Sequence, residues 1–135
     1  MVHYLDTSAL TKLVVAEAES KALRAWLTTD REPVACDLAR TELIRAVRRS
    51  APDRLLHARA VLDSLTLIDV TTSIFEQASR LDPPALRSLD AIHLATAQVL
   101  TNESGTTLVA FVTYDRRLLE CAKAAGLPTA SPGQN

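Results

Sequence analysis

The stretch YLDTSAL, residues 4–10, decides the fold, because it passes from an apolar run through an aspartate into a helical pattern. Residues 2–5 are short and apolar, which is typical of a buried strand. We therefore expect Asp6 to stand at the carboxyl end of that strand. In open sheets of parallel strands, this edge is where ligands and metal ions bind.

The same alternation of short apolar runs and helical patterns continues to the end of the chain. We expect strands at residues 2–5, 33–36, 66–70, 107–113 and 127–130. Helices are expected at residues 8–14, 17–27, 38–49, 52–64, 72–81, 88–100 and 115–125, with residues 102–105 and Gly126 as helix stops. Strands separated by helices form parallel sheets. The predicted fold is α/β: one domain over residues 1–130, three layers around a central parallel sheet of four to five short strands, and a loose tail at 131–135.

Composition limits the class of protein. The chain has 135 residues, enough for one domain with its own core. Its apolar stretches are interrupted well before the roughly 20 residues that span a bilayer, and no basic segment precedes an apolar run at the N-terminus. We expect a cytoplasmic protein with no membrane segment. Cys36 and Cys121 lack the spacing of a zinc or redox site and are expected to be free thiols.

Positive charge is concentrated in one part of a chain whose net charge is −1. Between residues 40 and 59 only Glu42 and Asp53 oppose six arginines: Arg40, Arg45, Arg48, Arg49, Arg54 and Arg59. Such a segment is either a basic ridge that contacts nucleic acid or a solvated helix face. The candidates for nucleic-acid contact are Arg45, Arg48 and Arg49.

Three further acids stand in contexts like that of Asp6: Glu42 in ARTELIRAV, Asp90 in SLDAIHLATA and Asp115 in VTYDRRL. Asp6 and Asp115 follow strands and so belong to one sheet edge, while Glu42 and Asp90 lie on helices that begin near it. Four acids at one point repel each other unless a cation or a basic group neutralises them. Carboxylate oxygens without a Cys/His set are typical of a Mg²⁺ or Mn²⁺ site.

Each acid, taken alone, also has a structural interpretation. Asp6 and Asp115 are suited to capping the helices that follow them. Glu42 is suited to a surface pair with Arg45, and Asp90 to the first turn of its helix, where the helix dipole favours a carboxylate. His93, three residues after Asp90, either orients that acid, contacts a phosphate, or is a partly buried, hydrogen-bonded side chain.

Together the motifs DTSAL (6–10), TEL (41–43), LDAIHLATA (89–97) and TYDRRL (113–118) resemble the PIN-domain ribonucleases, specifically the VapC toxins of bacterial and archaeal toxin–antitoxin pairs. The resemblance covers essentially the whole chain and implies a PIN domain over residues 1–130. It implies an acidic pocket of Asp6, Glu42, Asp90 and Asp115, with Thr7 and Thr113 as supporting polar side chains. Arg116 and Arg117 stand where many relatives carry an extra acid, which leaves one or two metal ions open.

The activity implied by this resemblance is metal-assisted hydrolysis of RNA. Asp6, Asp90 and Asp115 are expected to bind Mg²⁺ or Mn²⁺ directly or through water, and Glu42 to complete the shell or help deprotonate the attacking water. Cleavage by water leaves 5′-phosphate and 3′-hydroxyl ends. The resemblance also implies a homodimer and a cognate antitoxin that places a basic side chain in the acidic pocket.

Two other classes of protein share parts of this pattern. A non-catalytic RNA-binding or regulatory protein would keep the fold with a degenerate site, against which stands the presence of all four acids. Aspartate phosphatases and phosphoacceptor receiver domains also place acids at strand ends. Such a phosphatase needs a second aspartate where Ser8 stands, and a receiver needs a lysine that residues 113–115 do not supply.

Overall fold

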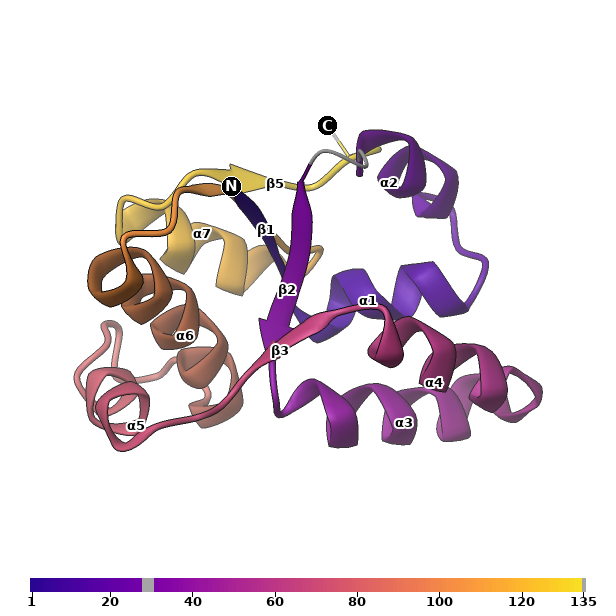
Figure 1. The fold of residues 1–135 in the computed structure, drawn as a ribbon, viewed down its shortest axis with the longest axis horizontal. Helices are drawn as coiled ribbons and strands as arrows, with labels where there is room; N and C mark the ends of the chain where they lie inside the picture. Colours follow the sequence, from indigo (N-terminus) through magenta and orange to yellow (C-terminus); the bar gives the residue numbers. More distant parts are fainter. Residues whose placement is uncertain (28–30, 135) are drawn as a thin grey trace.

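A computed structural model describes residues 1–27 and 31–134 of the chain. In this part, five parallel strands form one sheet in the order β3-β2-β1-β4-β5 (Figure 1). Their bounds are β1 Val2–Leu5, β2 Glu32–Cys36, β3 Thr66–Ile68, β4 Leu108–Val112 and β5 Thr129–Ala130. Tyr4 of β1 lies opposite Val34 of β2 and Phe111 of β4. The predicted α/β class and the parallel sheet are confirmed.

Helices cover both faces of the sheet. The bounds are α1 Thr7–Val14, α2 Ser20–Trp26, α3 Ala39–Ser50, α4 Leu55–Asp63, α5 Thr72–Ser79, α6 Ser88–Ser104 and α7 Arg116–Ala124, with a 3-10 turn, η1, at Pro52–Arg54. Helices α1 to α4 lie on one side of the sheet, and α6 and α7 lie on the other, with α5 packed against α6 (Figure 1). The result is the three-layer arrangement that the alternating pattern predicts.

Alternating side chains of the central strands supply two separate cores. Tyr4 and Phe111 belong to the core beneath α6 and α7, where their rings stack with centroids 5.1 Å apart. Leu5 and Val112, one residue further along each strand, belong to the core beneath α1, α3 and α4. Successive strand residues point to opposite faces, so a sheet covered on both sides buries every position. This explains why β4 is apolar throughout and why β1 is buried throughout, including its polar residue His3.

Several helix boundaries differ from the sequence prediction by one to four residues, including the end of α6 and the start of α4. The polar residues 102–104, expected to end a helix at residue 100, continue α6 to Ser104, and Gly105 ends it with a φ of 67°. Exposed polar side chains are compatible with a helix, whereas a residue in the left-handed region stops it. The segment expected to be one helix over 52–64 begins as η1 before α4 starts at Leu55.

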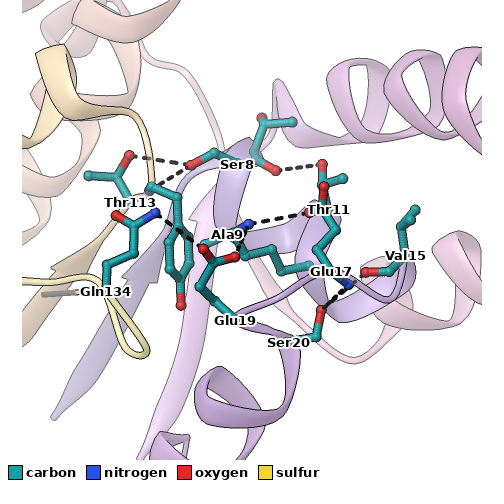
Figure 2. Close-up of polar contacts among 12 residues, drawn as sticks. Ser8, Ala9, Thr11, Val15, Glu17, Glu19, Ser20, Thr113 and Gln134 are labelled. Atoms are coloured by element: carbon teal, nitrogen blue, oxygen red, sulfur yellow. Dashed lines mark hydrogen bonds and ion pairs between the residues drawn. The ribbon is translucent and has the colours of Figure 1, made fainter.

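The C-terminal segment, expected to be loose, is instead held against the body of the protein. Ser131 Oγ donates to the Thr113 carbonyl at 2.6 Å, and Tyr114 Oη donates to the Pro132 carbonyl at 2.7 Å. Gln134 donates to Glu19 at 3.4 Å (Figure 2). Gly133 has a φ of 90°, and a Cβ there would lie 3.0 Å from Ala22 Cβ. A glycine is therefore needed for residues 131–134 to pack this closely against α2.

The topology fixes where a ligand can approach. The chain runs from β1 to β2 to β3 in one direction and then crosses to β4 on the other side of β1. In open α/β sheets, the crevice at such a reversal, beyond the carboxyl ends of the strands, is the usual binding site. Asp6 follows β1 and Thr113 follows β4 at this point. None of the helices in the described residues is long and apolar enough to cross a membrane.

Candidate active site

Four helix N-termini carry the four acids. Asp6 caps α1 by accepting from the Ala9 amide at 3.0 Å, and Asp115 caps α7 by accepting from the Leu118 amide at 3.2 Å. Glu42 and Asp90 lie in the first turns of α3 and α6. The first turn of a helix carries partial positive charge, which favours carboxylates and bound anions. The capping interpretation of Asp6 and Asp115 is therefore confirmed, and it does not exclude a second role for either acid.

Asp6 is held by hydrogen bonds on both carboxylate oxygens. Its Oδ1 accepts from Ser8 Oγ at 2.6 Å, and its Oδ2 accepts from Thr113 Oγ1 at 2.6 Å. Those two hydroxyls are fixed in turn, because Ser8 Oγ accepts from the Tyr114 amide and Thr113 Oγ1 from the Asp115 amide. Figure 2 shows Ser8 and Thr113 meeting here. Burial raises the pKa of Asp6, and the hydrogen bonds oppose that rise.

Side chains from two helices, α1 and α6, form hydrogen bonds with Glu42. Thr7 Oγ1 donates to Glu42 Oε1 at 2.9 Å, and His93 Nε2 lies 2.6 Å from the same oxygen. Burial would raise the pKa of Glu42, but the hydrogen bonds from His93 and from the Thr7 hydroxyl lower it below its ordinary value. The surface pair with Arg45 that the sequence allowed is not formed within the described residues. We call Asp6 and Glu42 the inner acids.

His93 connects Glu42 to the core of the sheet. Its ring is buried, and its Nδ1 lies 2.8 Å from Tyr4 Oη, which accepts from the Cys36 amide at 3.1 Å. Since Tyr4 Oη already accepts a backbone hydrogen, its own hydrogen is directed to Nδ1. That network assigns the His93 hydrogen to Nε2, where it is donated to Glu42. Sequence reasoning found His93 as a candidate partner of Asp90. It missed the roles of Tyr4 and Ser8, although both lie in the YLDTSAL stretch, because their partners are distant in the sequence.

Asp90 and Asp115, which we call the outer acids, are held differently. Within the described part of the chain the Asp90 side chain accepts no hydrogen bond, and Asp115 accepts only that of its helix cap. Burial raises the pKa of Asp90, and the charges of Asp115, Asp6 and Glu42 raise it further. Asp90 and Asp115 line one cavity, and Thr113 joins the Asp6 carboxylate to the Asp115 amide. Thr7, which follows Asp6 in the chain, donates to Glu42, so these contacts place the four acids around the ends of β1 and β4.

The carboxylates suit a hydrated divalent cation, which binds one or two protein carboxylates and keeps its other waters. Among residues 1–27 and 31–134, no group of three or more His, Cys, Asp or Glu side chains is arranged so that the protein alone could hold a metal ion. Mg²⁺ usually keeps several waters and takes one or two protein carboxylates. Asp90 and Asp115 have free oxygens for this, and a cation would relieve the mutual repulsion that raises the pKa of Asp90. Both oxygens of Asp6 are engaged by hydroxyls, which suits contact through water.

The arginines predicted to contact nucleic acid lie on α3. Arg45, Arg48 and Arg49 are exposed and surround a shallow hollow of their own. Arg48 and Arg49 are in the last turn of α3, whereas Glu42 is in the first. A rise of 1.5 Å per residue places Arg49 about 10 Å along the axis from Glu42. Arg48 and Arg49 therefore lie away from the acids, whereas Arg45 is within one turn of Glu42 but forms no ion pair with it in the described part of the chain.

Comparison with known proteins agrees with the fold and the motifs. The model of the PIN domain family matches residues 3–124. Ribonuclease VapC47 of Mycobacterium tuberculosis is 44% identical, covering 96% of both chains. Ribonuclease VapC35 of the same species is 46% identical over 97% of both chains, and Ribonuclease VapC46 is 42% identical over 96% of both.

Solved structures with lower identity share the fold. M. tuberculosis VapC20, a Sarcin-Ricin loop cleaving toxin, matches with a TM-score of 0.71 and 20% identity, covering 96% of this chain and 99% of that one. A chain of a toxin–antitoxin complex from Klebsiella pneumoniae matches with a TM-score of 0.65 and 24% identity, covering 84% and 86%. This chain belongs to the PIN-domain family and, within it, to the VapC ribonucleases.

Proposed function

We propose that this protein is a Mg²⁺- or Mn²⁺-dependent endoribonuclease that hydrolyses RNA with an activated water, and that it acts as the toxin of a toxin–antitoxin pair. The observation that supports the chemistry most directly is the set of contacts around the reversal of the sheet order: Thr113 joins Asp6 to the Asp115 amide, Thr7 donates to Glu42, and Asp90 and Asp115 line one cavity. Membership of the VapC ribonucleases supports RNA as the substrate. The non-catalytic alternative has no support from the site, because all four acids are present.

In this proposal a bound cation lowers the pKa of water and offsets the charge of the scissile phosphate. Asp90 and Asp115 would hold the cation, with Asp6 in contact through water. Glu42 stays ionised because His93 and Thr7 stabilise its charge, and it accepts a hydrogen bond that orients the attacking water. The helix N-termini that carry the acids also direct amide groups and partial positive charge towards the phosphate.

The experiment that tests the proposal is cleavage of a single-stranded RNA with and without added Mg²⁺ or Mn²⁺. We expect cleavage with either metal, none with EDTA, and products with 5′-phosphate and 3′-hydroxyl ends. Replacing the ribose 2′-hydroxyl at the cleavage site with hydrogen should leave hydrolysis intact, because the nucleophile is water. Cleavage in EDTA, or products with 2′,3′-cyclic phosphate ends, would contradict the proposal.

The proposed antitoxin is a protein that places an arginine or lysine among the four acids. A basic group there would replace the charge of the cation, so inhibition and metal binding would compete. Titrating Mn²⁺ into the toxin–antitoxin complex should restore cleavage, whereas Na⁺ at equal ionic strength should not. Equal inhibition at all Mn²⁺ concentrations would show that the antitoxin acts away from the acids. A homodimer is also proposed, and sedimentation of the free toxin tests it.

Arg45, Arg48 and Arg49 are proposed as a second, weaker RNA contact. Because Arg48 and Arg49 lie along α3, away from the acids, this group would bind phosphates distant from the cleavage point. Replacing all three with glutamine should weaken RNA binding about uniformly across sequences and reduce its salt dependence. An unchanged salt dependence would identify them as a solvated helix face.

A further inference from the structure

A cavity of about 620 Å³ opens directly beside the outer acids. It lies between α7 and the loop that precedes α6, on the side of the sheet where both helices pack (Figure 1). The volume is within the range of sites that hold small organic ligands. Its lining combines acids, arginines and apolar groups: Asp90, Asp115 and Glu120; Arg87, Arg116 and Arg117; Pro83, Ala85, Leu86 and Cys121.

Its three arginines stand at the starts of the helices that carry the outer acids. Arg87 precedes α6 and is three residues before Asp90, while Arg116 and Arg117 open α7 immediately after Asp115. All three are exposed, and within the described residues none forms an ion pair. Free guanidinium groups at helix N-termini bind oxyanions, phosphates above all. The cavity therefore offers anion-binding groups next to the acids proposed to hold a cation.

The apolar part of the lining favours an occupant larger than a free phosphate. Pro83, Leu86 and Cys121 form a surface that a small hydrated anion would leave uncovered. A planar aromatic group packs on such a surface, and arginine side chains add stacking. A nucleotide has both an anionic part and a planar part of this kind, and RNA supplies nucleotides at the acids in the proposed function.

We propose that this cavity binds the nucleotide that adjoins the scissile phosphate of single-stranded RNA. Arg116 and Arg117 bind its phosphate, and its base packs against Leu86 and Pro83. The inference rests on the proposed function, which supplies the RNA strand at the acids. A basic segment of a protein partner is the competing occupant, because Asp90, Asp115 and Glu120 also line the cavity, and the second test below separates the two.

The first test measures binding without cleavage. In an Asp6→Asn background with Mg²⁺, we expect Arg116→Gln/Arg117→Gln to weaken binding of a fluorescent single-stranded RNA oligonucleotide by about tenfold. The salt slope should fall by about two, one for each lost phosphate contact. The control, Lys21→Gln/Arg24→Gln, removes two exposed charges from α2 on the opposite face and should change the affinity less than about twofold. Equal effects of the two double variants would overturn the proposal.

The second test uses Cys121 as a local reporter. Cys36 is fully buried, whereas Cys121 is partly accessible and lines the cavity. We expect the RNA oligonucleotide to slow modification of Cys121 by a thiol reagent at least about threefold, a rate followed by mass spectrometry. Protection by the antitoxin but not by RNA would overturn the proposal in favour of a protein occupant. An unchanged rate with RNA bound would also overturn it.

The two proposals fail in different ways. If the wild-type protein cleaves no RNA with Mg²⁺ or Mn²⁺, the proposed function fails and the nucleotide site fails with it. If the wild-type protein cleaves RNA while Arg116→Gln/Arg117→Gln retains the wild-type KM, only the nucleotide site fails. We expect this double variant to raise KM about tenfold with a smaller change in kcat, because the arginines contact the flanking nucleotide and not the reacting water.

Discussion

The inner and outer acids share one site but are held in opposite ways. Both oxygens of Asp6, and Oε1 of Glu42, accept hydrogen bonds from side chains elsewhere in the chain. Asp90 accepts none among the described residues, and Asp115 accepts only that of its cap. The inner acids are therefore positioned by the protein, whereas the outer acids keep oxygens free for a ligand. A site needs both kinds of group, because fixed groups orient the reaction and free groups bind.

The largest expected effect comes from removing an outer charge. Asp90→Asn should reduce metal-dependent cleavage by more than about 100-fold, beyond the 10–100-fold typical of lost supporting contacts to a metal. Its thermal stability without metal should equal or exceed that of the wild type, because the substitution removes the repulsion from three other acids. Asp63→Asn, on the exposed end of α4, is the control. A parallel loss of stability and cleavage would make Asp90 structural.

The second largest effect is expected from removing the Thr113 hydroxyl, which donates a hydrogen bond to the inner acid Asp6. Thr113→Val keeps the shape of a fully buried side chain but removes the hydroxyl that donates to Asp6 and accepts from the Asp115 amide. We expect a loss of about 1–3 kcal/mol in the free energy of unfolding, measured by urea titration, because buried partners are left unpaired. Thr101→Val, whose hydroxyl bonds only within α6, should cost less than about 0.5 kcal/mol. Similar costs would show that Asp6 does not depend on Thr113.

At Asp115 the roles of helix capping and metal binding can be tested separately. Asparagine can accept the same amide hydrogen, so Asp115→Asn should cost a few tenths to about 1 kcal/mol of stability. The neutral amide removes a charge from the site, so half-maximal cleavage should require at least about tenfold more Mn²⁺. Cleavage rates over a Mn²⁺ series decide between the roles. Wild-type metal dependence would leave Asp115 as a helix cap alone.

Tyr4 tests whether the core fixes the inner acid Glu42. Tyr4→Phe removes the hydroxyl that directs a hydrogen to His93 Nδ1, so the single Nε2–H tautomer should give way to a mixture. Nitrogen-15 NMR of the imidazole rings reports the tautomer, with His3 and His57 as internal references. Cleavage should fall about tenfold, as for other supporting contacts. An unchanged His93 spectrum would show that Glu42 alone sets the tautomer.

The smallest expected effect is a pair of opposite pH dependences. Asp90 has a raised pKa when folded, so its contribution to stability falls as pH rises from its ordinary value of 3.8 through the raised pKa. Glu42 has a lowered pKa, so its contribution is present above its ordinary value of 4.5 and is lost as pH falls through the lowered pKa. Urea titrations of Asp90→Asn and Glu42→Gln from pH 3 to 7, without metal, should therefore deviate from wild type in opposite directions. Deviations of the same sign would contradict this comparison of inner and outer acids.

The sequence alone was enough to predict the order of strands and helices and the positions of the four acids. Apolar periodicity is a local property, and the central strands are apolar on both faces because helices cover both. Asp6 and Asp115 could be placed at one sheet edge because Asp6 directly follows β1 and Asp115 comes three residues after the end of β4. The C-terminal segment was predicted wrongly because its contacts with Thr113, Tyr114 and Glu19 are distant in the sequence. The end of α6 was predicted too early because residues 102–104, although polar, continue the helix to the stop at Gly105.

Only the tertiary structure decided which acid is held and which is free. Thr113 reaches Asp6 across 107 residues of sequence, and Tyr4 reaches His93 across 89. Neither pairing leaves a signal in the spacing of motifs, because strand order and helix packing determine it. The cavity beside Asp90 and Asp115 is likewise formed by two separate segments, the loop before α6 and helix α7. The sequence determined which chemical groups this protein has, and the packing of distant elements determined which of them remain available to a ligand.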